Sequence, residues 1–410
     1  MSKNLEKNLS WTTIGMVVYN FAIWVFGALV LRLLGGVASG YYAVAISIGN
    51  TLYAISLWGM RAFVVADQNQ TYSYDEYFSV RIYAILLSCV LLFVSTIVFG
   101  YSSAQNTIIF LYAIFKFSEA IIELLDCFGQ QQLQMDVNAK SMVLRGILFS
   151  ALFYFTLQVT KNLPIGFVVL LLISILMLLF YNLPRIKKIV SITPKLVWNQ
   201  NVIRIIKDCA PIMVFELLAA AIIAIPRLFF ERVGSLEALG IYTSIYSMVV
   251  FLQLVINVLI YTFAPYMAKA YEANDNKSFK NYIVLLFGGA IGLGLLAEGL
   301  VYFLGKPVMS LLFGQMAGEY YHYLYLGILS GVTLTFTWIL SQIFVIIHRT
   351  SDQLICSIVS TIACFVLSYY FINPADCNSM TMILIGTNLL FVVCAILLLL
   401  FRKNPKEDRN

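Results

Sequence analysis

The stretch from Pro164 to Asn182, PIGFVVLLLISILMLLFYN, contains 19 residues and no charged side chain. About 20 mostly apolar residues in a helix are enough to cross the hydrocarbon core of a bilayer. A helix also satisfies its own backbone N–H and C=O groups, which find no water in that core. The stretch therefore predicts one membrane-spanning helix.

Eleven further runs of the same kind are spread along the chain. Together they predict an all-α membrane protein with about 12 transmembrane helices. The twelve runs are 10–34, 41–66, 80–100, 107–128, 141–160, 164–182, 209–230, 238–263, 281–304, 322–347, 353–373 and 379–401.

The composition agrees with this class and excludes several others. Of the 410 residues, 61% are hydrophobic and 11% are charged, whereas soluble domains are nearer ~45–50% apolar and ~25% charged. The net charge of +6 is spread out without a long basic block, so no nucleic-acid partner is expected. Two histidines and seven cysteines without a C-x-x-C spacing predict no metal site, disulfide framework or cofactor.

One long polar segment interrupts the runs. Residues 184–208 contain Pro184, Pro194 and six lysines or arginines. We expect this segment to be a cytoplasmic linker between an N-terminal six-helix bundle, 1–183, and a C-terminal six-helix bundle, 209–410.

The two halves are predicted to be related by a parallel internal repeat. Four residues recur at an offset of 200 positions, and three of them mark the turn from the first helix of each half into the second. Transporters often contain such repeats. The matched residues are Arg32 and Arg232, Gly40 and Gly240, Tyr42 and Tyr242, and Phe63 and Phe263.

The positive charges predict the orientation. If the N-terminus is cytoplasmic, 20 of the 26 lysines and arginines lie in cytoplasmic loops and helix ends, and only five lie outside. An excess of lysine and arginine marks the cytoplasmic side. Both termini are therefore expected in the cytoplasm. The five outer residues are Arg32, Lys161, Arg227, Arg232 and Lys306.

The fourth run carries an unusual number of charges. Lys116, Glu119, Glu123 and Asp126 fall within roughly 80° of one helix face, and each charge is costly at membrane depth. One interpretation is that the acids couple transport to protons or bind sugar hydroxyls. The alternative is a structural ion-pair network around Lys116.

Other charged residues in or beside the runs are candidate substrate ligands. Arg61, Arg145 and Arg227, with Arg32 and Lys116, could hold phosphate, because the planar guanidinium group binds pairs of oxygen atoms. For Arg61 and Arg145 the alternative is that the side chains reach the inner membrane surface. Glu216 is grouped with the acids as a coupling or sugar-binding candidate.

No nucleotide-binding motif accompanies these charges. Gly288, Gly289, Gly292 and Gly294 lie inside a predicted span and lack the flanking strand and Gly-Lys-Ser/Thr of a phosphate loop. Gly288 and Gly292 have instead the spacing that brings two helices together. ATP hydrolysis by this chain is therefore not expected.

Five stretches of the chain carry a resemblance to a known family. They are Arg32-Leu-Leu-Gly, Gly40-Tyr-Tyr-Ala, Ile225 to Gly234, Leu239-Gly-Ile-Tyr242, and Lys116 to Asp136, which begins in the fourth run. They resemble the O-antigen and polysaccharide repeat-unit flippases, which share a superfamily with multidrug and toxin extrusion antiporters and lipid II flippases. The similarity covers nearly the whole chain, although no short motif in it is diagnostic.

The resemblance implies two six-helix bundles around a central cavity, working by alternating access in the bacterial inner membrane. The implied substrate is an undecaprenyl-diphosphate-linked oligosaccharide, such as an O-antigen unit of lipopolysaccharide, moved from the cytoplasmic to the outer leaflet. The implied partners are this polyprenyl-linked glycan, membrane lipid and polysaccharide polymerase machinery.

Two other functions are alternatives to this one. The first is a cation-coupled multidrug antiporter. The second, an enzyme such as a membrane glycan polymerase, is disfavoured because no large outer loop could house its chemistry. We therefore expect a transporter and not an enzyme.

The charge distribution makes the topology testable. A single cysteine replacing Asn199, in a background without Cys377, should resist impermeant thiol reagents in intact cells and react after the cells are opened. The physical reason is that the 184–208 segment carries six cations, which the positive-inside rule retains in the cytoplasm. Ready labelling from outside would reverse the orientation.

Overall fold

The computed structural model describes residues 3–67, 69–193 and 195–401, and within these ranges the regular structure is helical. The chain divides into two compact units, Met1–Ala220 and Ala221–Asn410, and the division falls within helix α9. Four cations counted toward the cytoplasmic side, Arg402, Lys403, Lys406 and Arg409, lie outside the described residues, as do the side chains of Lys3 and Lys7.

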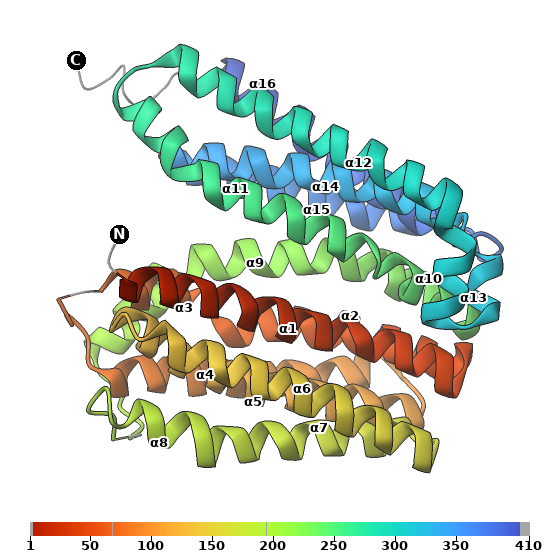
Figure 1. Ribbon diagram of the computed structural model, residues 1–410, viewed down its shortest axis with the longest axis horizontal. Helices are drawn as coiled ribbons and strands as arrows, with labels where there is room; N and C mark the ends of the chain where they lie inside the picture. The colour runs from red at the N-terminus through yellow and green to blue at the C-terminus, as the bar shows by residue number, and fades with distance from the viewer. Residues whose placement is uncertain (1–2, 68, 194, 402–410) are drawn as a thin grey trace. The chain divides into compact units, whose positions relative to one another are not determined.

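The first unit contains six long helical segments and the start of a seventh (Figure 1). Two of the segments are extended by short pieces: α3 follows α2, and the π-turn η1 and α8 follow α7. The elements are α1 (Lys3–Leu34), α2 (Gly36–Leu57), α3 (Met60–Ala66), α4 (Tyr74–Phe99), α5 (Ser103–Gln131), α6 (Met135–Thr160), α7 (Leu163–Met177), η1 (Leu178–Asn182) and α8 (Leu183–Ile186).

The second unit begins within α9 and contains the remaining long helices (Figure 1). Its elements are α9 (Gln200–Val233), α10 (Leu236–Tyr246), α11 (Val249–Glu272), α12 (Asn276–Phe313), α13 (Gln315–Glu319), α14 (Tyr323–Ile346), α15 (Thr350–Phe371) and α16 (Asn378–Phe401).

The prediction of about 12 transmembrane helices is confirmed. Each predicted run falls on long helical structure, and eleven segments of the described chain are long and apolar enough to cross a membrane. The twelfth run lies in α5, which misses that criterion because of its polar and charged side chains. Helix α9 begins at Gln200, earlier than its apolar run. A helix can extend beyond its apolar residues as long as its backbone hydrogen bonds continue.

The run predicted at 41–66 contains a sharp break. Trp58 and Gly59 both adopt positive φ, at 54° and 59°, and separate α2 from α3. Glycine adopts this conformation at little cost, whereas tryptophan needs support. The Trp58 indole N–H donates to the Ile206 carbonyl of α9 at 3.0 Å, which holds the break in place. The break therefore separates α3, which carries Arg61, from the course of α2.

The predicted internal repeat is confirmed by the way helices pair. In the first unit α2 packs against α4 and α5, and α7 packs against α5 and α6. In the second unit α11 packs against α12 and α14, and α16 packs against α14 and α15, which repeats these four pairings in the same chain order. The extensive pairing of α1 with α6 has no comparable counterpart between α9 and α15. The offset residues Tyr42 and Tyr242 also correspond: Tyr42 packs on Tyr112 of α5, and Tyr242 on Tyr323 of α14.

Glycine permits a close approach of α1 and α6. A Cβ atom on Gly15 would lie 2.8 Å from the Ala139 carbonyl oxygen, and one on Gly146 would lie 3.0 Å from the Val18 carbonyl oxygen. The predicted packing role of Gly288 and Gly292 is wrong for the described residues, because a Cβ on either would meet nothing within 4 Å. Gly294 is the close contact of that group, at 2.6 Å from a Val332 methyl carbon.

The α1–α6 contact predicts a difference between two glycines. Gly15→Leu should lower the thermal stability of the detergent-purified protein, because backbone atoms of α6 occupy the space and overpacking typically costs about 1–3 kcal/mol. Gly288→Leu, the matched control, should leave the unfolding temperature near that of the wild type. Equal unfolding temperatures for the two variants would contradict the close approach.

Candidate functional site

The charged side chains of α5 lie inside the first unit and pair with arginines from its neighbours. Glu119, Glu123 and Asp126 are spaced so that each follows the last by about one helical turn, which places them on a shared face. Arginines from three other elements meet this face: Arg61 of α3, Arg81 of α4 and Arg145 of α6.

Arg145 forms the centre of the more buried part of the cluster. Its side chain is only 4% exposed, and its guanidinium donates to Glu119 at 2.5 Å and to Asp126 at 3.4 Å. Glu119 also accepts hydrogen bonds from the Tyr19 hydroxyl of α1 and from the Ser174 hydroxyl of α7, the latter at 2.6 Å. Arg145 therefore does not reach toward the membrane surface, and four helices meet at one carboxylate.

Glu123 forms the second part of the cluster by bridging two arginines. Its two oxygen atoms accept from Arg61 Nε at 2.8 Å and from Arg81 Nη2 at 2.7 Å. Arg81 is fully buried and also donates to the Ser56 carbonyl at 2.9 Å, which ties α4 to the end of α2. The Arg61 side chain is 44% exposed and lies at the rim of the cluster, where it also bonds Gln130 at 3.0 Å.

Lys116 stands apart from these ion pairs. Its ammonium group lies 4.0 Å from the centre of the Tyr53 ring of α2. Among the described residues no carboxylate comes within ion-pair distance of it. The expected structural network is thus present, but it centres on Arg145 and Glu123, and the prediction that Lys116 organises it is wrong.

Several polar atoms in this region have no hydrogen-bond partner within the described part of the chain. They are Arg81 Nε, Arg145 Nε, Asp126 Oδ1 and Glu216 Oε2. Glu216 is on the part of α9 that belongs to the first unit, where Glu123, Arg81 and Arg61 are the charges that act on it. The structure therefore brings Glu216 into the neighbourhood of the α5 cluster.

Two predicted cations are not part of this cluster. Arg32 lies in the last turn of α1, at the end of the bundle away from α3 (Figure 1). Arg227 belongs to the second unit, where its guanidinium lies 5.7 Å from the centre of the Tyr246 ring. Their predicted contact with substrate stays a prediction.

Sequence reasoning missed Arg81, Tyr19, Ser174 and Tyr53. The predicted run 80–100 begins just before Arg81 and so places Arg81 at a cytoplasmic helix end. However, α4 begins at Tyr74 with a capping box in which Ser73 and Glu76 cap each other. This Ser-x-x-Glu pattern was readable in the sequence, and it would have placed Arg81 within the helix. No local signal identified the other three.

The interior of the second unit has different chemistry. Its buried side-chain hydrogen bonds include Tyr242 to Thr381 at 2.8 Å, Tyr246 to Ser330 at 3.0 Å, and an Asn388 amide to the carbonyl of Ser330 at 3.4 Å. These are neutral hydroxyl and amide groups. The second unit also has a buried ion pair, Arg349 with Asp352 at 2.5 Å, but it joins residues only three positions apart. A charged cluster that joins several helices is therefore described for the first unit and not for the second.

No family model matches this chain. A curated relative, named a capsular polysaccharide biosynthesis protein CapF from Staphylococcus aureus, is 24% identical over 318 residues, covering 77% of this chain and 79% of the relative.

Several solved structures similar to this chain are those of transporters. An inward-facing multidrug resistance MATE family transporter of the MOP superfamily has a TM-score of 0.60 at 14% identity, over 95% of this chain and 96% of that one. An outward-facing structure of such a transporter has a TM-score of 0.55 at 15% identity, covering 96% and 93%. A variant of the Vibrio cholerae MATE transporter VcmN has a TM-score of 0.56 at 11% identity, covering 97% and 95%. The chain thus has the twelve-helix fold of the MATE transporters.

Proposed function

We propose that this chain is a flippase that moves an undecaprenyl-diphosphate-linked oligosaccharide from the cytoplasmic to the outer leaflet by alternating access. Within this proposal the first unit holds the anionic diphosphate, and the lipid tail stays in the membrane. The proposal includes the orientation derived from the charges, with both termini and the 184–208 segment in the cytoplasm.

The proposal rests on the surroundings of Lys116, whose ammonium group contacts the Tyr53 ring and has no carboxylate within ion-pair distance among the described residues. A cation inside a spanning helix costs about 2.5–3.5 kcal/mol or more, and a chain that retains one without a carboxylate partner needs a compensating interaction. The Tyr53 ring supplies part of it. A transient anion, such as a diphosphate, would supply the rest. Lys116 is therefore assigned to phosphate binding.

The arginines add donors suited to the same ligand. Arg81 and Arg145 each keep a buried Nε without a hydrogen-bond partner among the described residues, although their other nitrogen atoms are engaged. Arg61 is accessible at the rim. A diphosphate has several oxygen atoms in the geometry that guanidinium groups bind in pairs. These side chains could therefore exchange carboxylate for phosphate partners.

The alternative, a cation-coupled multidrug antiporter, is supported by the fold of the solved structures. It is disfavoured by the ion pairs that the acidic residues of α5 already form. Glu119, Glu123 and Asp126 each contact an arginine, which leaves these carboxylates less available to an organic cation. The printed name of the curated relative, a capsular polysaccharide biosynthesis protein, adds support for the glycan substrate.

The direction of transport fits the charge of the proposed ligand. A diphosphate is negative, and the cytoplasm of a bacterium is negative relative to the outside. Moving one negative charge outward is assisted by about 2.3 kcal/mol per 100 mV. The membrane potential can thus drive the proposed reaction, with or without a coupled proton.

Lys116 and Arg145 should differ when they are removed. Lys116→Ala should insert at near wild-type abundance but lose transport, because no carboxylate among the described residues lies within ion-pair distance of its ammonium group, which contacts the Tyr53 ring instead. Arg145→Ala should lower abundance and thermal stability, because it leaves Glu119 and Asp126 buried without a counter-charge, at a cost of about 3–5 kcal/mol. The measurements are inserted protein and lipid-linked glycan flipped in proteoliposomes. Wild-type transport by Lys116→Ala would remove it from the site.

The acids are tested separately as proton carriers. Glu119→Gln should remain folded, because the Gln carbonyl oxygen can accept from Tyr19, its NH2 group can donate to the Ser174 hydroxyl oxygen, and Arg145 keeps Asp126. If Glu119 carries the coupled proton, the dependence of transport on pH should disappear in this variant. Glu237→Gln, on an exposed residue of α10, is the control. An unchanged pH profile in Glu119→Gln would limit this residue to a structural role.

A further inference from the structure

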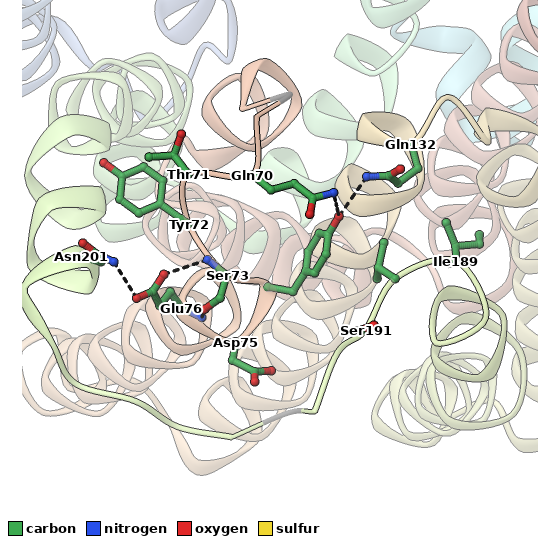
Figure 2. Close-up of a pocket in the computed structure, with 12 residues that line it drawn as sticks. Gln70, Thr71, Tyr72, Ser73, Asp75, Glu76, Gln132, Ile189, Ser191 and Asn201 are labelled. Carbon is green, nitrogen blue, oxygen red and sulfur yellow. Dashed lines mark hydrogen bonds between the residues drawn. The ribbon is translucent and has the colours of Figure 1, made fainter.

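A polar pocket of about 670 Å³ opens at one end of the first unit, beside the loop that joins α3 to α4 (Figure 2). Its walls are that loop, the end of α5 and the segment that leads from α8 to α9. The loop supplies Gln70 and Tyr72, the end of α5 supplies Gln132, and the segment supplies Ser191. The volume lies within the range of small-molecule sites, about 300–1,000 Å³.

The α8–α9 segment forms a fixed wall of the pocket. Asp75, in the first turn of α4, accepts hydrogen bonds from the backbone N–H and the hydroxyl of Thr193, at 3.2 and 2.8 Å. Glu76 accepts from the amides of Asn199 and Asn201 at 2.7 and 2.9 Å. The pocket is therefore built by specific contacts between parts of the chain more than a hundred residues apart.

The α3–α4 loop forms the facing wall, and Asp67 holds its shape. Asp67 accepts from the backbone N–H groups of Thr71 and Tyr72 at 2.8 and 3.1 Å, and from the Tyr77 hydroxyl at 2.9 Å. Burial alone would raise the pKa of Asp67, but these hydrogen bonds outweigh it and lower the pKa. The loop is thus held by a charged carboxylate.

Amide and hydroxyl groups dominate the interior of the pocket. The Tyr74 hydroxyl accepts from the amide of Gln70 at 3.3 Å and from that of Gln132 at 3.0 Å (Figure 2). The Tyr74 O–H remains available to donate, and each glutamine amide presents a carbonyl oxygen that can accept. A ligand that both donates and accepts hydrogen bonds fits this lining.

The lining excludes two other ligand classes. No lysine or arginine lines the pocket, and Asp75 and Glu76 would repel phosphate. Both carboxylates already accept hydrogen bonds on each oxygen atom, and no group of residues in the described chain has the composition of a metal site. The remaining chemistry is that of a neutral, hydroxyl-rich molecule.

We propose that this pocket binds the sugar portion of the lipid-linked substrate before it is moved. This inference rests on the proposed function and deepens it, because it separates recognition of the sugar from recognition of the diphosphate. On the charge-derived orientation, the pocket opens toward the cytoplasm, where such a glycan is assembled.

The spacing along α5 connects the two sites. Gln130 bonds Arg61 at the rim of the charged cluster, and Gln132 bonds Tyr74 in the pocket. Nine residues separate Glu123 from Gln132, which is about 14 Å along a helix. A diphosphate beside Arg61 would therefore place the following sugars along the end of α5 and into the pocket.

The test fills the pocket without changing the hydrogen bonds that build it. Ser191→Trp places a large side chain on the exposed wall, and Ser351→Trp, on an exposed residue at the start of α15, is the matched control. Gln70→Leu is a second pocket variant, which removes one amide from the exposed loop. The full chain in nanodiscs is titrated with undecaprenyl diphosphate and with a panel of undecaprenyl-diphosphate-linked oligosaccharides.

We expect the wild type to bind at least one glycosylated lipid more tightly than undecaprenyl diphosphate. Ser191→Trp should bind that lipid at least about tenfold more weakly and undecaprenyl diphosphate unchanged, which also shows that it is folded. Gln70→Leu should shift in the same direction, Arg61→Ala should weaken both lipids, and Ser351→Trp should weaken neither.

Other outcomes separate failure of this inference from failure of the function. Equal binding of both lipids by the wild type, or a retained glycan preference in Ser191→Trp and Gln70→Leu, would overturn the sugar site and leave the flippase proposal standing. Binding of neither lipid would overturn the flippase proposal itself. Binding of ethidium that Ser191→Trp abolishes would assign the pocket to organic cations instead.

Discussion

The ion pairs of Arg145 with Glu119 and Asp126 are the interaction on which the first unit depends. A carboxylate at membrane depth is costly unless it pairs with a cation or accepts hydrogen bonds. Each carboxylate of α5 therefore favours packing against the helices that supply those groups. Glu119 draws together α1, α6 and α7, and Glu123 draws together α3 and α4. Because an unpaired charge at membrane depth is costly, these contacts help to specify which helices meet.

The two units show that a repeated fold does not require repeated chemistry. Four helix pairings recur in the same order. The charged cluster that joins several helices lies in the first unit, while the second has hydroxyl and amide contacts such as Tyr242 with Thr381 and a local ion pair, Arg349 with Asp352. Helix pairing depends on shape, whereas substrate choice depends on the few polar groups that face the ligand. The likeness to MATE transporters accordingly describes the architecture, and the proposal of an anionic substrate rests on Lys116 and on the arginines of the first unit.

The 184–208 segment has a structural role that its polar composition did not predict. A stretch with two prolines and six cations has the composition of an exposed tether. In the structure, Asp75 and Glu76 bind it to the first turn of α4, and it becomes a wall of the polar pocket. The capping box of α4 contributes directly, because Glu76 both caps the helix and receives the Asn199 amide. One carboxylate therefore begins a helix and anchors a distant segment.

The sequence by itself determined the number of spans, the repeat and the charged face of α5, because hydropathy and helical periodicity are local properties of the chain. It also identified Arg61, Arg145 and Lys116 as candidate substrate ligands. Only the tertiary structure decided their partners. Arg81, hidden at the edge of an apolar run, completes the Glu123 bridge, and Lys116 is left with Tyr53 instead of a carboxylate. Which charges meet depends on how helices far apart in the chain rotate and pack against each other, and no local pattern encodes that choice.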